Sequence, residues 1–234
     1  LRSFVLVLVM GVSAYFTISG PLAKLRVTLF PIIPLETSTP PSISYLGYQT
    51  FGINPTIFGL ITGGVFLVYG LYNHKNQMKF TSIFWSIIVS VAIVVGWLGT
   101  SWIARSAYEP IAVQSFTFVA PVGETILYAM YGSAISMKFG IGAVIGVLIG
   151  AFFGSLIKGH FRWEACEDPR ELKRQILGAS IMGIGAVLSL GCSVGQGLTA
   201  FSALSYSAPL TLSCIYLGAR IGLFQLIEGF HPAE

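Results

Sequence analysis

One short segment of the sequence holds the residues best suited to bind a small anion. It reads Gly191-Cys192-Ser193-Val194-Gly195-Gln196-Gly197 and lies inside the charge-free stretch 176–219. That stretch is too long for one membrane span, so we expect the glycine-rich segment to break it. Backbone N–H groups at the start of a half-helix attract anions, and the Cys192 thiol adds a weak, soft donor for a polarisable sulfur atom. The alternative is a small buried cysteine that only packs.

A second candidate is Glu124, which follows Pro121 and Gly123 and precedes an apolar segment. Ionisable side chains at membrane depth are costly and usually functional, so Glu124 and Gly123 are predicted to line the mouth of a cavity after a backbone break. The alternative is an interfacial residue that interacts with the dipole of its own helix.

The remaining candidates are weaker. Cys214 is interpreted as a packing residue inside the last span, Cys166 lies in a polar loop, and the role of Arg220 stays open between anchoring at the interface and neutralising an anion. No His lies near a Cys or Ser, and the sequence holds no CxxC pair or metal-ligand cluster. We therefore expect no enzyme activity, metal or cofactor.

Composition identifies the environment of these residues. Of 234 residues, 54% are hydrophobic and only 9% are charged, with a mean hydropathy of +0.80; soluble domains carry about 25% charged residues. These values exclude a soluble globular protein, a disordered chain and a nucleic-acid binder. The length leaves room for about five to seven crossings of a lipid bilayer.

The apolar runs predict an all-α polytopic membrane protein. Full spans are expected at 3–23, 56–72, 80–104, 139–157 and 209–227, and a helix ending at about Leu190 precedes a short helix that ends at about Ser205. The segment 125–137 is too short to cross comfortably. The range 21–55 holds six of the eleven prolines and is predicted to be an extramembrane loop.

Basic residues orient the spans. The segment 158–174 holds five Lys or Arg and the loop 73–79 holds two, so both are assigned to the cytoplasm, whereas 105–118 holds one and is assigned outside. With these assignments, the parity of the crossings requires the segment 120–137 to enter the membrane from outside and return.

Two stretches of the chain resemble each other. Both contain x-Val-Gly-(Glu or Gln), a short helix, a longer helix and Gly-Ala-x-x-Gly, and they define repeat-like modules at 118–157 and 176–227. Repeated modules of broken and spanning helices are typical of transporters, whose substrate sites lie at the breaks. The alternative is chance similarity between glycine-rich membrane helices.

These motifs resemble the YeeE/YedE family of sulfur-transport membrane proteins. The resemblance runs from about residue 1 to 227. Its most specific part is Gly-Cys-x-x-Gly-Gln-Gly at 191–197. Three further segments also match: Phe161-Arg162-Trp163-Glu164, Leu217-Gly218-Ala219-Arg220 and Ala120-Pro121-Val122-Gly123-Glu124-Thr125. It implies that Cys192 lines a pathway for thiosulfate, and that a cytosolic sulfur carrier of the TusA type is a partner. The family pattern has an upstream Gly-Gly-Cys half, and this chain starts with Leu1, so we expect it to be a fragment of a longer chain.

The leading hypothesis is a single transport domain over 1–234 in the cell inner membrane, importing thiosulfate or a related small sulfur anion. Its predicted pathway residues are Cys192, Gly191, Ser193, Gly195, Gln196, Gly197, Glu124 and Gly123. Two alternatives remain: a membrane docking subunit for a cytosolic sulfurtransferase, and a transporter of another sulfur or selenium species.

Overall fold

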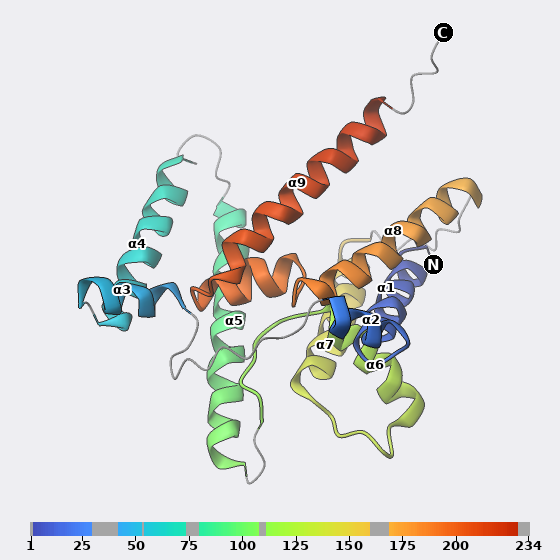
Figure 1. The fold of residues 1–234 in the computed structure, drawn as a ribbon, viewed down its shortest axis with the longest axis horizontal. Helices are drawn as coiled ribbons and strands as arrows, with labels where there is room; N and C mark the ends of the chain where they lie inside the picture. Colours follow the sequence, from blue (N-terminus) through green and yellow to red (C-terminus); the bar gives the residue numbers. More distant parts are fainter. Residues whose placement is uncertain are drawn as a thin grey trace. The chain divides into compact units, whose positions relative to one another are not determined.

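The computed structural model describes residues 2–29, 42–52, 54–73, 80–107, 111–159 and 169–228 (Figure 1). Every named element in these ranges is a helix, as predicted. The helices are α1 (Arg2–Ile18), α2 (Leu22–Leu29), α3 (Ile43–Phe51), α4 (Pro55–Asn73), α5 (Phe80–Ser106), α6 (Val119–Tyr131), α7 (Phe139–Ile157), α8 (Pro169–Leu188), the π-helical η1 (Gly195–Ala200) and α9 (Ser207–Glu228).

Three helices in the described ranges are long and apolar enough to cross a bilayer by themselves: Thr81–Ser106 in α5, Phe139–Ile157 in α7 and Ser207–Leu226 in α9. The bent pairs α1 with α2 and α3 with α4 would bring the number of spans to five. The chain is therefore a multi-pass membrane protein. The α8 helix does not qualify, because its first turns carry four charged residues.

Two expected boundaries differ from the structure. The apolar run 3–23 was predicted as one span, but α1 ends at Ile18 and α2 continues at an angle of 59° after Gly20 and Pro21. The proline-rich range 21–55 contains α2 and α3, so it is not loop throughout. Pro21 directly precedes α2 and Pro55 is the first residue of α4, positions where a missing N–H does not interrupt the helix.

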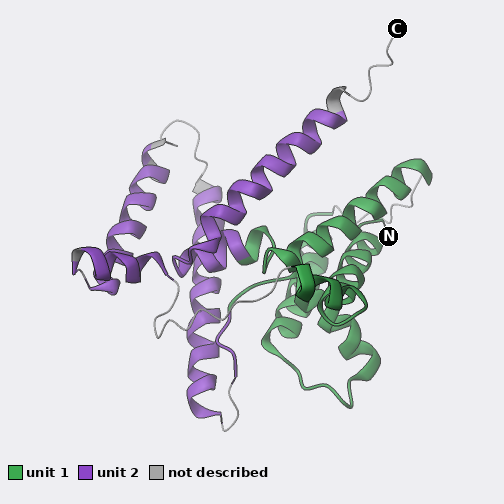
Figure 2. Cartoon of the chain, in the orientation of Figure 1, with its two compact units in different colours: residues 1–34, 115–195 green, residues 35–114, 196–234 purple. Residues whose placement is uncertain are grey.

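The chain forms two compact units (Figure 2). Unit 1 comprises 1–34 and 115–195, and unit 2 comprises 35–114 and 196–234. The first repeat-like module, 118–157, lies within unit 1, whereas the second, 176–227, divides after Gly195. That all of 1–234 serves as one transport domain stays a prediction.

Close backbone contacts build unit 1 around α1, which packs against both α8 and α6. A Cβ added at Gly183 of α8 would lie 2.6 Å from the carbonyl oxygen of Met10, and one added at Gly123 of α6 would lie 2.8 Å from that of Gly11. Small residues at these crossings let helices approach closely, as is common in membrane proteins. The contacts bury Ala14 in a cluster with residues from α6 and α8.

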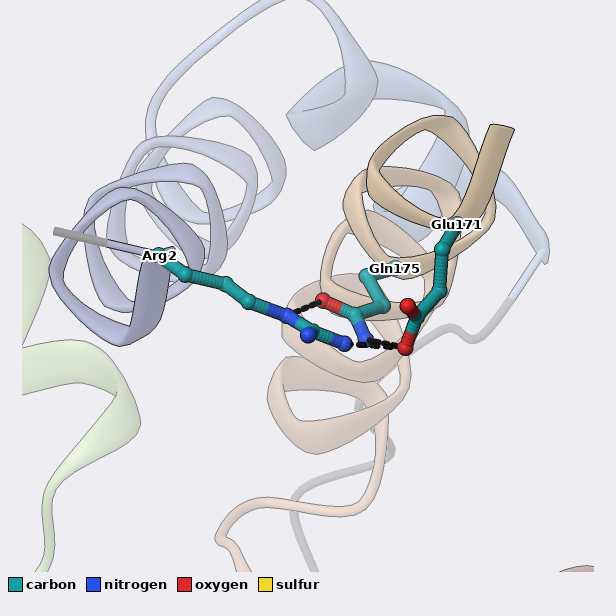
Figure 3. A network of polar contacts seen from close by, with 3 residues as sticks. All are labelled: Arg2, Glu171 and Gln175. Carbon is teal, nitrogen blue, oxygen red and sulfur yellow. Dashed lines mark hydrogen bonds and ion pairs between the residues drawn. The ribbon is translucent and has the colours of Figure 1, made fainter. Parts of the chain in front are cut away.

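A polar network joins the starts of α1 and α8 (Figure 3). Arg2 Nε donates to Gln175 Oε1 at 2.7 Å, the Arg2 guanidinium pairs with Glu171, and Gln175 Nε2 donates to Glu171 Oε1 at 3.0 Å. Further along both helices, Gly183 lies against Met10. The two helices therefore run parallel, and Arg2 is at the same end of unit 1 as the start of α8.

In unit 2, α3 packs on α4, where a Cβ at Gly47 would lie 2.8 Å from the Phe58 ring. The N–H of Ile43, at the start of α3, donates to the carbonyl oxygen of Leu204 at 2.8 Å. The Thr100 hydroxyl of α5 donates to the carbonyl of Gln114 at 2.7 Å. These bonds tie the start of α3 and the segment after α5 to the rest of the unit.

Candidate functional site

The predicted helix break begins where α8 ends. The N–H of Leu190 donates to the carbonyl of Val187 at 3.2 Å, and the N–H of Gly191 donates to that of Ala186 at 2.9 Å. Leu190 has φ of 59°. This combination is a Schellman C-cap, with leucine at the left-handed position that glycine usually occupies. The break is confirmed, but it is shorter than predicted, because the chain is helical again from residue 193.

Cys192 starts the short helix that follows. Its Sγ accepts a hydrogen bond from the backbone N–H of Gly195 at 3.4 Å, the contact that a serine or aspartate side chain makes when it caps a helix. The side chain is 8% exposed and packs in the unit 1 cluster with Ala14, Val119 and Val187. The cysteine is therefore buried among apolar side chains, as in the packing alternative, and it also lies at a helix start; that it contacts an anion stays a prediction.

This hydrogen bond determines which donors remain for an anion at Cys192. We expected free backbone donors beside Cys192, but the Gly195 N–H is occupied by the sulfur. The sulfur acts here as the acceptor, so its S–H hydrogen is left to donate to another group. A small anion displacing this bond would meet both the thiol and the released Gly195 N–H.

The short helix ends in the same way as α8. The N–H of Leu204 donates to the carbonyl of Phe201 at 2.9 Å, the N–H of Ser205 donates to that of Ala200 at 3.1 Å, and Leu204 has φ of 52°. Leu190 and Leu204 are the only non-glycine residues with positive φ in the described ranges. Left-handed leucine is costly, and such conformations concentrate at functional sites.

The glycine-rich motif extends into this helix. Gly195, Gln196 and Gly197 were predicted to lie in the break, but they form the first half of η1. A Cβ at Gly195 would lie 2.9 Å from Thr117 Oγ1, so the motif's glycine permits a close contact inside unit 1. π-Helical turns are rare and occur frequently at functional sites. Gly191 is buried and Ser193 is exposed.

Gln196 and Glu124, the equivalent positions of the two modules, make equivalent contacts. In unit 2, buried Gln196 accepts at Oε1 a hydrogen bond from Ser207 Oγ at 3.2 Å, and Ser207 is the first residue of α9. In unit 1, Glu124 Oε1 pairs with Lys138 Nζ at 3.0 Å, and Lys138 directly precedes α7. Each side chain thus reaches the start of the helix that follows it, and the repeat itself stays a prediction.

The surroundings of Glu124 differ from the prediction in one respect. Pro121 and Gly123 lie inside the first turns of α6, where proline is tolerated, so no backbone break occurs there. Gly123 instead makes the close contact with α1. The Glu124 side chain is 30% exposed.

The other candidates receive no new role. Cys214 was interpreted as a packing residue, but it is exposed on α9; Arg220 is exposed on the same helix, and Cys166 lies outside the described residues. Within the described ranges, no group of three His, Cys, Asp or Glu side chains could hold a metal ion.

A family model described as sulphur transport matches residues 1–221. The chain belongs to the sulphur transport family. This agrees with the resemblance seen in the motifs, and the family is one of transporters rather than enzymes.

Two relatives are both thiosulfate transporters named TsuA. The protein from Spirochaeta thermophila is 26% identical over 173 residues, covering 73% of this chain and 49% of the relative. The protein from Escherichia coli (strain K12) is 27% identical over 99 residues, covering 42% of this chain and 28% of the relative. The chain thus spans about half or less of the length of these family members.

Sequence reasoning missed Lys138, Leu190 and Leu204. Lys138 had a detectable signal, because Glu124 and Lys138 are the only charged residues between 110 and 157 and have opposite signs. The leucines had none, since leucine rarely adopts a left-handed conformation.

Proposed function

We propose that the protein imports thiosulfate or a related small sulfur anion across the cell inner membrane, and that Cys192 lines its pathway. The observation that carries this proposal is the Cys192 thiol capping the helix that follows a backbone break. The family and the names of the two relatives support the substrate class.

The mechanism needs no covalent step. A dianion that leaves water loses strong hydration, so several donors must replace it along the pathway. At Cys192, the sulfur releases the Gly195 N–H, which serves an oxygen of the anion, while the polarisable thiol faces the terminal sulfur. Because each contact is weak, the anion can leave as readily as it binds.

Gln196 of the second module and Glu124 of the first have corresponding roles. Gln196 and Glu124 each contact the start of the following long helix, so an anion that displaces either contact acts on that helix directly. Gly191, Ser193, Gly195 and Gly197 supply backbone at the break and in the first turns after it. Gly123 contributes by letting α6 approach α1.

A cytosolic sulfur carrier of the TusA type is the proposed partner, and it would dock at the cytoplasmic face. The competing candidate is a membrane subunit that docks such a carrier and moves nothing, and a third is transport of another sulfur or selenium species. Uptake of ³⁵S-labelled thiosulfate by a strain lacking other importers separates them. Accumulation supports import, whereas carrier binding without accumulation supports docking. Competition by unlabelled selenium and sulfur anions identifies the preferred species.

A further inference from the structure

An open groove lies beside the start of α7 in unit 1. Its volume is about 630 Å³, and among the residues that line it Lys138 is the only charged one. The rest of the lining is apolar or small and includes Gly142 and Gly146 along α7. The rings of Phe116 and Phe139 are in edge-to-face contact, with their centroids 5.5 Å apart. A cation set among apolar walls is suited to attract an anion, because low-dielectric walls strengthen its field.

The start of α7 is held firmly against α6. A Cβ at Gly140 would lie 2.7 Å from Pro121 Cγ, so the two first turns touch with no room for a side chain. This contact brings Lys138 to Glu124, and the Nζ to Oε1 distance is 3.0 Å. The side chains of Lys138 and Glu124 are 54% and 30% exposed.

The carboxylate of Glu124 pairs with the Lys138 ammonium, so an external anion that binds Lys138 must compete with it. Ion pairs with this much exposure are weak, because water competes for both charges. A small dianion brings twice the charge of one carboxylate and can therefore displace it. Within 110–157, Lys138 and Glu124 are the only charged residues, and Lys138 is the only one that lines the groove.

We propose that this groove is the site where a small sulfur oxyanion is first captured, with Lys138 binding the dianion and Glu124 competing for the lysine. The inference rests on the proposed function and adds a recruiting residue to it. Our orientation assigns 105–118 to the outside, which places the groove at the entrance for import. Glu124 then sets how readily the anion is taken up.

Substitutions of Lys138 and Glu124 are expected to change the KM for thiosulfate in opposite directions. We expect Lys138→Gln to raise the KM for ³⁵S-thiosulfate about fivefold at unchanged Vmax, a change equivalent to about 1 kcal/mol, and Lys138→Arg to restore it. Glu124→Gln should lower KM about twofold to threefold, because the lysine is released. The double variant should behave like Lys138→Gln alone. Lys158→Gln, which removes the lysine at the other end of α7, is the matched control and should leave KM unchanged.

A second measurement separates this inference from the proposed function. Equilibrium dialysis of ³⁵S-thiosulfate against purified protein reports capture without transport, and binding should weaken in Lys138→Gln but not in Lys158→Gln. Unchanged KM and binding in Lys138→Gln overturn the inference and leave import standing. Equal losses of Vmax in both single variants, with no further loss in the double variant, overturn it in favour of a structural ion pair. Binding without uptake by the unmodified protein overturns import alone, and neither binding nor uptake overturns both.

Discussion

The sulfur of Cys192 accepts a hydrogen bond from the backbone N–H of Gly195 at 3.4 Å. This one contact gives the cysteine two possible roles. It caps the short helix after the break, which is a structural role, and it holds a thiol and a displaceable N–H at a helix start, which is a transport role.

We expect the protein to be less stable with leucine than with glycine at position 190. Leu190 has φ of 59° and its side chain is 80% exposed, so Leu190→Gly removes strain and little packing. We expect a gain of about 1 kcal/mol, seen as a higher melting temperature of the purified protein.

The matched control is Leu188→Gly, in the last residue of α8, where glycine lowers helix stability by up to about 1 kcal/mol. A lower melting temperature in Leu190→Gly would contradict the Schellman description of this helix end.

The contact between α1 and α8 depends on Gly183. An added Cβ would lie 2.6 Å from the carbonyl oxygen of Met10, so Gly183→Ala should push the helices apart and destabilise the protein by about 1–3 kcal/mol. Gly185→Ala is the control on the same helix, because its added Cβ meets open space. Thermal unfolding in detergent compares the two variants, and equal melting temperatures would refute the close packing.

The parallel arrangement of α1 and α8 makes a topological prediction. Residues 158–174 are assigned to the cytoplasm by their charge, and Arg2 lies at the same end of unit 1 as Glu171. In a cysteine-free background, single cysteines at Ser3 and Lys158 should both react with a membrane-impermeant maleimide only from the inside. Gly159 is avoided because its φ is 64°.

Labelling of both sites from the outside would reverse the orientation and remove the basis for a re-entrant 120–137. Labelling from opposite sides would contradict the parallel helices themselves.

The spans were predictable because they depend on composition alone. The bounds of α7 agree with the charge-free run 139–157, and α5 and α9 differ by about two residues at an end. The bend after α1 was missed, because 3–23 reads as one apolar run and only Gly20 and Pro21 signal a turn there. Local propensity also did not reveal α2 and α3 within a proline-rich range.

The candidate site was predictable in its location but not in its contacts. A glycine-rich segment in a long charge-free stretch indicated a break, and the break is present at 189–192. The cap by Cys192 and the pairing of Glu124 with Lys138 depend on where neighbouring turns and helices place side chains, which no spacing rule reports. Pro121 and Gly123 suggested a second break, yet proline in a first helical turn does not interrupt a helix.

The central claim, that the Cys192 thiol contacts the transported anion, is tested most directly by ³⁵S-thiosulfate uptake in Cys192→Ser. Serine is a strong helix cap, so it keeps the structural role and loses only the soft sulfur contact. We expect uptake to fall about tenfold, equivalent to about 1.4 kcal/mol, at normal membrane levels. Cys192→Ala should abolish uptake, and Cys214→Ala, which changes an exposed thiol, should leave it unaltered. Full uptake by Cys192→Ser would mean that the thiol only caps the helix and would contradict the account.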